Sequence, residues 1–322
     1  MASTSTVKSG AANARGISGT PGVSSKASSN ATSKILYVVR HGQALHNPRA
    51  EAAKEKGCSM EEFFRLMRED DALDSDLTDL GREQAKQCHR DHFVVEGGNS
   101  HNPLGIDLVV ASCLSRTIDT ADLVFPPNPS TPTKIGGDGG DSPLSPPRIS
   151  IDKFREVNGN LLNGKRRTKS ELIARNPIWN FDSLVTEEDE SWTTEMEEFK
   201  DVAERGYRGL VELLTGETYP ETESGSARSE LLFNNSDTNT ILLVCHGGIL
   251  RYMMNMHPLV HLSDERTANH EEAHTRKSIE SRFDNCELRK YRLSWKDDVS
   301  GTNDERSSDG SLRAIVLSQL DH

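Results

Sequence analysis

The stretch Ile35-Leu36-Tyr37-Val38-Val39-Arg40-His41-Gly42 decides the fold. Its first five residues form an unbroken apolar, β-prone run, which is typical of a strand buried on both faces. The run passes directly into a polar turn that ends in glycine. Similar runs cover 106–111 and 241–245, with helical patterns between them. This alternation predicts an α/β fold, a three-layer α/β/α sandwich with a mostly parallel central sheet.

Several helices and a last strand are predicted around these runs. A helix over 78–92 opens with Thr78 as its N-cap, and a long amphipathic helix covers 195–214. Residues 60–68 read as a short inserted helix, and 314–317 as the last strand. We therefore expect one layered domain rather than a chain of repeats.

The domain is expected to cover residues 34–322. Residues 1–33 are rich in Ser, Thr, Ala and Gly, so we predict a disordered leader that buries too little apolar surface to fold. Polar or proline-rich stretches predict loop insertions near 126–148, 215–239 and 296–311. Sheet-like segments resume after each of them, so they are insertions and not domain linkers.

The composition excludes several classes of function. The 322 residues include 38 basic and 50 acidic side chains, a net charge of −12, which disfavours nucleic acid and anionic membranes as partners. No apolar run approaches the roughly 20 residues of a membrane-spanning helix. Five widely spaced cysteines without a CxxC pair argue against a disulfide scaffold and a zinc finger. We expect a cytoplasmic protein, or an organellar one if the leader, basic and free of acidic residues, is a transit peptide.

Histidines and an arginine follow the three apolar runs. His41 comes after the first run with Arg40 beside it, Arg116 lies just after the second, and His246 follows the third with two glycines behind it. The carboxyl ends of parallel strands meet at one edge of a sheet, so His41, Arg116 and His246 are expected to converge there. Guanidinium groups and close backbone approach at glycine suit a tetrahedral anion.

These motifs resemble those of the histidine phosphatase superfamily, branch 1, also called phosphoglycerate mutase-like. They follow the family's order over about residues 35–295. The matching residues are Arg40-His41-Gly42-Gln43 with Asn47, Leu77-Thr78 with Gly81, Gln84 and Ala85, Ser112 to Thr117 with Thr120 and Ala121, Phe154-Arg155-Glu156 with Gly159, and Val244 to Gly248.

Within the superfamily the chain most resembles the plant and fungal phosphoglycerate mutase-like proteins. The shared pieces are Arg155-Glu156, Lys165-Arg166-Arg167, the segment 176–192 and Asn285 to Arg289. The chain departs from that pattern at Asn163-Gly164, where a Cys-Asp pair is expected before the basic residues.

The resemblance implies catalysis through a phosphohistidine, without a metal or other cofactor. His41 is then the nucleophile, with its other ring nitrogen donating to a backbone carbonyl. Arg40, Arg116 and His246 hold the phosphoryl oxygens, and Glu156 transfers protons to the leaving group and from water.

Further residues are expected to bind the substrate. Asn47 and Gln43 offer neutral donors, and Gly247 leaves space beside the phosphate. Arg166 and Arg167 are expected either to read a second anionic group or to form a solvated basic turn.

The expected activity is that of a phosphatase on a small phosphomonoester, its sole expected partner. The alternatives are a phosphoglycerate mutase-type phosphotransferase, which the sequence 157–164 disfavours, and a non-catalytic binder of a phosphorylated ligand. The substrate and the oligomeric state stay open.

Two other motifs are expected to play no part in the chemistry. His270-Glu271-Glu272-Ala273-His274 fits the HExxH zinc pattern, but the segment is polar on every face and lacks the apolar stripe of a buried helix. Cys245 lies within a predicted strand and is expected to pack, not to act as a nucleophile.

Overall fold

The computed structural model describes residues 33–95, 101–128, 145–218, 233, 238–264, 282–296 and 313–321. Residues 1–32 of the predicted leader, most of the three predicted insertions and the segment His270 to His274 lie outside these ranges. The predictions for these segments therefore concern residues outside the described part of the chain.

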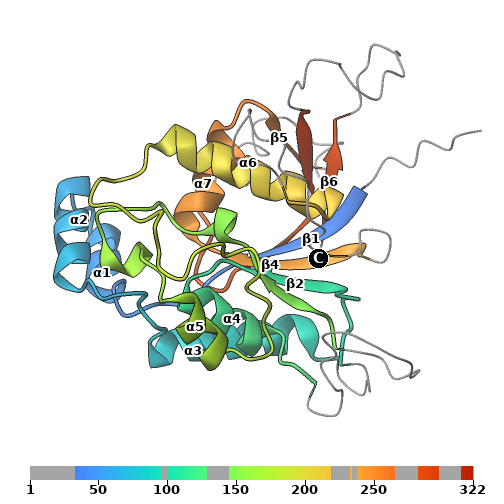
Figure 1. The fold of residues 1–322 in the computed structure, drawn as a ribbon, viewed down its shortest axis with the longest axis horizontal. Coiled ribbons are helices and arrows are strands. Elements are labelled where there is room, and N and C mark those ends of the chain that lie inside the picture. Colours follow the sequence, from blue (N-terminus) through green and yellow to red (C-terminus); the bar gives the residue numbers. More distant parts are fainter. Residues whose placement is uncertain are drawn as a thin grey trace, which may run out of the picture. The chain divides into compact units, whose positions relative to one another are not determined.

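A seven-stranded sheet forms the centre of the fold, in the order β3-β2-β4-β1-β6-β7-β5 (Figure 1). β6 runs antiparallel to its neighbours β1 and β7, and every other neighbouring pair is parallel. The prediction of a mostly parallel sheet is confirmed. The strands are β1 (Ser33–Arg40), β2 (Leu108–Ala111), β3 (Arg148–Ser150), β4 (Thr240–Cys245), β5 (Val260–Asp264), β6 (Leu288–Trp295) and β7 (Ile315–Gln319).

Helices cover both faces of this sheet (Figure 1). They are α1 (Pro48–Glu55), α2 (Met60–Glu69), α3 (Asp79–Phe93), α4 (Ser115–Val124), α5 (Lys169–Arg175), α6 (Phe199–Thr215) and α7 (Gly247–Met256), with the 3-10 turns η1 (Asp152–Phe154) and η2 (Leu162–Gly164). None of the described helices is long and apolar enough to cross a membrane.

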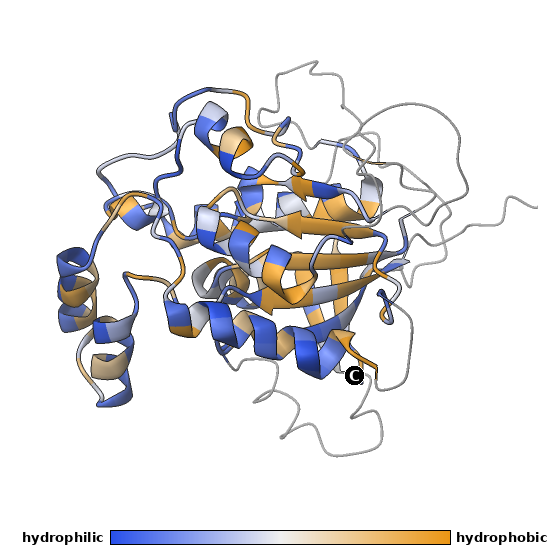
Figure 2. Cartoon of the chain, turned by 90° about the horizontal axis from the view of Figure 1, so that it is seen from below, coloured by the Kyte–Doolittle hydropathy of each residue, from blue (hydrophilic) through white to orange (hydrophobic). Residues whose placement is uncertain are grey.

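Alternate side chains of β1 enter the two halves of the core. Leu36 and Val38 belong to the cluster that contains the buried side chains of α6 and α7. Tyr37 and Val39 belong to the cluster under α3, α4 and α5. Figure 2 shows the apolar strands between helices whose outer faces are hydrophilic. Burial on both faces is the reason that the first strand reads as a continuous apolar run.

The predicted helices form with small shifts of their ends. Thr78 caps α3 by accepting a hydrogen bond from Gly81 N at 3.0 Å, and Ser59 caps α2 in the same way from Glu62 N at 3.1 Å. The antiparallel strand β6 was not predicted, because its sequence alternates apolar with charged residues and lacks the buried run that marks β1 and β4.

Candidate active site

Histidines that follow two neighbouring strands lie against each other. β1 and β4 are parallel, and their last residues, Arg40 and Cys245, are register partners. His41 N also donates to Cys245 O at 2.9 Å, so His41 and His246 leave the sheet side by side. Their ring centroids are 4.9 Å apart in an edge-to-face arrangement. The convergence of the two histidines expected from the sequence is confirmed.

The environment of His41 leaves one of its ring nitrogens unprotonated. Its Nδ1 lies 2.7 Å from Gly42 O. A carbonyl oxygen only accepts hydrogen bonds, so Nδ1 carries the proton and Nε2 keeps its lone pair. Burial, followed by the positive charges of Arg116 and Arg40, lowers the pKa of His41 well below 6.5. The ring is therefore neutral at pH 7, with an unprotonated Nε2.

Several buried nitrogens around His41 have no hydrogen-bond partner within the described part of the chain. Burial, followed by the charge of Arg116, lowers the pKa of His41, His46 and His246, which shows that these groups lie close together. A buried donor without a partner costs about 1–3 kcal/mol, and a tetrahedral anion would satisfy this group. The atoms are Arg40 Nε, His46 Nδ1, Arg116 Nε and Nη2, and His246 Nδ1.

Each of the two arginines is held by hydrogen bonds within the described chain and keeps unpaired nitrogens, Nε in Arg40 and both Nε and Nη2 in Arg116. Arg40 donates from Nη1 to Phe283 O at 3.0 Å and from Nη2 to Glu51 Oε1 at 2.8 Å. Arg116, which is fully buried, donates from Nη1 to Asn163 O at 2.7 Å. These contacts hold the guanidinium planes while their remaining nitrogens stay unpaired, as an anion-binding fork requires.

Ser112 sets the orientation of His246. The Ser112 hydroxyl lies 2.8 Å from His246 Nε2 and accepts a hydrogen bond from Leu114 N at 3.2 Å. When its own hydrogen points to Nε2, the ring proton is on Nδ1. Nδ1 is the unpaired atom, so His246 presents a free N–H donor.

The carboxylate of Glu156 lies at the N-terminus of α7. Its Oε1 accepts from Val157 N and Ile249 N, each at 3.0 Å, and its Oε2 from Gly248 N at 3.1 Å. A Cβ atom on Gly248 would lie 2.1 Å from Glu156 Oε1, so only glycine permits this approach. The three N–H donors fix the position of the carboxylate.

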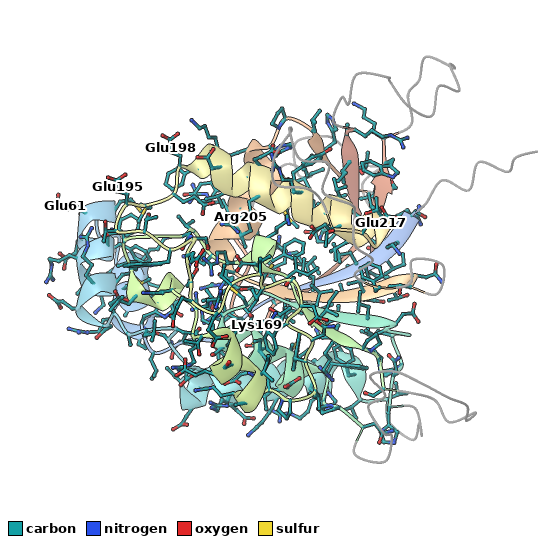
Figure 3. The ribbon with its side chains drawn as sticks, viewed as in Figure 1. Glu61, Lys169, Glu195, Glu198, Arg205 and Glu217 are labelled. Carbon is teal, nitrogen blue, oxygen red and sulfur yellow. The ribbon has the colours of Figure 1, made fainter. Side chains whose placement is uncertain are left out.

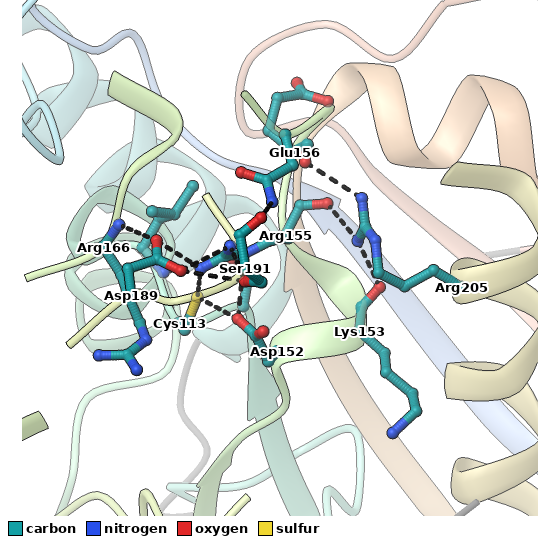
Figure 4. Close-up of polar contacts among 12 residues, drawn as sticks. Cys113, Asp152, Lys153, Arg155, Glu156, Arg166, Asp189, Ser191 and Arg205 are labelled. Carbon is teal, nitrogen blue, oxygen red and sulfur yellow. Dashed lines mark hydrogen bonds and ion pairs between the residues drawn. The ribbon is translucent and has the colours of Figure 1, made fainter. Parts of the chain in front are cut away.

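A buried network holds the backbone next to Glu156 (Figure 4). Arg205 reaches from α6 and donates to Lys153 O at 2.8 Å, Arg155 O at 3.0 Å and Glu156 O at 3.2 Å. Arg155 forms a bidentate ion pair with Asp189, with both N···O distances 3.0 Å. These contacts fix the loop from two sides and so position Glu156.

His41 and Glu156 line one cavity of about 460 Å³. Three cations from separate segments, Lys54, Arg251 and Arg282, line the same cavity. Within the described part of the chain, Glu156 is the single carboxylate in its lining. The cavity is therefore electropositive, although the chain as a whole carries a charge of −12.

The predicted substrate-binding residues divide into two groups. Asn47 and Gly247 line the cavity, and Asn47 Oδ1 accepts from Ala44 N at 3.0 Å, which fixes its side chain. Gln43 does not line the cavity, because its Oε1 accepts from Thr78 Oγ1 at 3.0 Å.

Cys245 is buried in β4, and burial raises the pKa of its thiol, as expected for a packing residue.

Arg166 and Arg167 were expected either to bind a second anionic group or to form a solvated turn. The structure shows neither arrangement. Arg166 is buried and donates to the carbonyl oxygens of Arg167, Thr186, Glu187 and Glu188. Its guanidinium is therefore consumed by the backbone of one loop. Arg167 forms ion pairs with Asp74 and Asp76, and neither arginine lines the cavity.

His46 is a site residue that the sequence reasoning missed. It is buried, lines the cavity and has an unpaired Nδ1. Its position directly before Asn47, in the turn after the first strand, was the available signal. Lys54, Arg251 and Arg282 carried no such signal, because each is a single cation outside the motifs that follow the apolar runs.

The chain is similar in sequence to known proteins. No family model matches the chain. It is 28% identical over 271 residues to phosphoglycerate mutase-like protein 1 of Arabidopsis thaliana, covering 80% of this chain and 79% of that protein. A second Arabidopsis phosphoglycerate mutase-like protein is 30% identical over 186 residues, covering 54% of this chain and 63% of that protein.

Two solved structures also align with the chain. One is a phosphoglycerate mutase from Bacillus anthracis (TM-score 0.39, 15% identity, 81% of this chain and 88% of that one). The other is a putative α-ribazole-5′-P phosphatase from Escherichia coli (TM-score 0.38, 17% identity, 80% of this chain and 90% of that one).

Proposed function

Because this chain is a relative of the phosphoglycerate mutase-like proteins, with the motifs of the histidine phosphatase superfamily, we propose that it is a phosphatase that hydrolyses phosphomonoesters through a phosphohistidine on His41. The observation that carries the proposal is the set of unpaired buried nitrogens of Arg40, His46, Arg116 and His246 around a neutral His41. A phosphoryl group supplies the acceptor oxygens that these donors lack.

In the first step, His41 Nε2 attacks phosphorus and the bond to the ester oxygen breaks. The charge that develops on the phosphoryl oxygens is stabilised by the guanidinium groups of Arg40 and Arg116 and by the Nδ1–H of His246. Glu156 takes part in this step as the carboxylic acid and delivers its proton to the departing alkoxide.

In the second step, water attacks the phosphohistidine. Glu156, now a carboxylate, takes the proton of that water, and inorganic phosphate leaves as His41 returns to its neutral form. The three N–H donors on Glu156 support this role, because they hold its carboxylate in one position at the cavity.

The distribution of charge supports an anionic substrate. Figure 3 shows Glu61, Glu195 and Glu198 at the periphery of the chain, where all three are exposed. The cations Lys54, Arg251 and Arg282 instead line the cavity. A local positive field in a cleft draws in anions even when the net charge is negative.

The proposal is tested by hydrolysis of a generic aryl phosphate, 4-nitrophenyl phosphate, with the wild-type chain and the His41→Ala variant. We expect release of nitrophenol by the wild type and a loss of about 10³-fold or more in the variant, because the nucleophile is absent. An unchanged rate in His41→Ala would contradict the assignment of His41.

Two further measurements separate the alternatives. A phosphatase releases inorganic phosphate from 3-phosphoglycerate, whereas a mutase yields its isomer. Acid quenching during turnover is expected to trap acid-labile phosphate on the wild-type chain and none on His41→Ala. Its absence with every hydrolysed or bound phosphoester would favour a non-catalytic binder.

A further inference from the structure

One wall of the cavity that contains His41 is made of apolar side chains. α2 contributes Phe63 and Phe64, which meet edge to face with ring centroids 5.7 Å apart. Phe199 and Tyr252 lie beside the same cavity and stack with centroids 4.3 Å apart. Aromatic pairs from α2, α6 and α7 therefore face the space next to the phosphate-binding nitrogens.

Part of this wall has no role in the core of the described chain. Met67 and Phe63 pack with Ala50 and Leu161 in a small cluster that holds α2 in place. Phe64 and Phe199 belong to none of the three apolar clusters, and Phe199 is 42% exposed. These rings contact the cavity without being needed to hold the sheet and its helices together.

Methionines extend the same surface. Met60 and Met196 line the cavity, and neither belongs to an apolar cluster. Met60 is 55% exposed. Unbranched thioether side chains adapt to ligands of different shape, and apolar side chains left open beside a polar centre are typical of a ligand site.

The volume of the cavity also fits a ligand that is larger than a phosphoryl group. A volume of about 460 Å³ falls within the range of roughly 300–1,000 Å³ that holds drug-sized ligands. A phosphoryl group at His41 fills only a small part of it. The apolar wall lines the same cavity as His41, so it is available to the ester group of a phosphomonoester bound there.

We propose that the apolar wall formed by Met60, Phe63, Phe64, Met196, Phe199 and Tyr252 is a subsite for the alcohol part of the substrate, and that this alcohol is a bulky apolar or aromatic group. The inference rests on the proposed function for the position of the phosphate. It excludes a compact, fully polar alcohol as the preferred substrate, since such a group would leave the wall in contact with water.

A pair of uncleavable ligands tests the subsite without requiring turnover. Propylphosphonate and 3-phenylpropylphosphonate have the same charged head and differ only by a phenyl group. Calorimetric titration of the full chain is expected to show at least tenfold tighter binding of the phenyl compound, which corresponds to about 1.4 kcal/mol. Equal affinities, or no binding of either compound, would overturn the inference.

Substitutions in the apolar wall test whether it causes the preference for the phenyl compound. Phe64→Ser is expected to reduce the affinity ratio of the two phosphonates at least threefold. Leu80→Ser is the matched control, because Leu80 is exposed and lies on α3 outside the cavity lining. An unchanged ratio in both Phe64→Ser and Met196→Ser would assign the preference to another surface and overturn the proposal.

Hydrolysis is measured separately on the matching esters, propyl phosphate and 3-phenylpropyl phosphate, whose primary alcohols are similar leaving groups. If the chain binds the phenyl phosphonate more tightly but cleaves neither ester, the result supports the subsite and contradicts the catalytic proposal. If the chain cleaves both esters with equal kcat/KM and binds both phosphonates equally, the result supports the catalytic proposal and contradicts the subsite.

Discussion

The rings of His41 and His246 meet edge to face at the ends of two adjoining parallel strands, with centroids 4.9 Å apart. The hydrogen bonds of the two rings differ. His41 directs Nδ1 to its own chain at Gly42 and leaves Nε2 open, whereas His246 contacts Ser112 through Nε2 and leaves Nδ1 open. Two neutral imidazoles side by side thus present a lone pair and a donor to the same centre.

Inorganic phosphate should stabilise the chain through Arg116. At a phosphate concentration about 100 times its Kd, the free energy of unfolding is expected to rise by about 2.7 kcal/mol. Arg116→Met should lose most of this phosphate effect, because the variant has no guanidinium nitrogens to donate to the anion.

Urea unfolding of both proteins, with and without phosphate, measures these quantities. Chloride at equal ionic strength controls for screening. Equal stabilisation of wild type and Arg116→Met by phosphate would show that the anion binds elsewhere.

Stability should fall as the pH drops just below 6.5. The pKa values of His41, His46 and His246 are lowered in the folded state, so below 6.5 the unfolded chain binds more protons than the folded one. The free energy of unfolding then rises with pH, by up to about 1.4 kcal/mol per pH unit for each such histidine.

Unfolding by urea at pH 7.5 and pH 6.0 tests the sign. His46→Asn should have a shallower dependence than the wild type, because one of the three groups is removed. A wild-type chain that is more stable at pH 6.0 than at pH 7.5 would rule out this account.

Gly248→Ala should impair catalysis more than folding. The added Cβ would lie 2.1 Å from Glu156 Oε1, so the carboxylate must move away from the N-terminus of α7. We expect kcat to fall by about 10²-fold, the lower end of what general acid–base catalysis contributes, with a small change in KM. Steady-state kinetics with an alkyl phosphate, whose leaving group needs a proton, measures the effect.

Gly164→Ala is the matched control for this variant. The Cβ added there would meet Val157 O at 3.5 Å, an ordinary contact. If both variants lose the same activity, the close approach of Gly248 to Glu156 has no special role.

The cations at the cavity should control substrate capture. The double variant Lys54→Gln/Arg251→Gln is expected to raise KM by about three- to tenfold at low salt, with kcat little changed, because both residues line the cavity and their field attracts anions. Its kcat/KM should also depend less on ionic strength than that of the wild type.

Lys56→Gln serves as the control, since Lys56 is an exposed cation at the C-terminal end of α1 that does not line the cavity. The same salt dependence in the double variant and the wild type would contradict electrostatic capture by these side chains.

The amino-acid sequence alone determined the parallel strands at the centre of the sheet and the edge at which His41 and His246 meet. The apolar runs at 35–39 and 241–245 specify buried parallel strands because both of their faces must leave water. Once these strands are neighbours, the backbone carries His41 and His246 to the same level. The local sequence places each histidine directly after a strand, and the parallel register of β1 and β4 then brings the two together.

Only the tertiary structure decided which basic side chains reach the cavity. Arg166 looked like a ligand-binding residue in the sequence, but four carbonyl oxygens near it, three of them from the loop 186–188, take up its guanidinium. Lys54, Arg251 and Arg282 come from separate segments and line the cavity together. The partner of a cation in a loop or on a helix surface is set by segments distant in the chain, and these contacts form only when the chain packs.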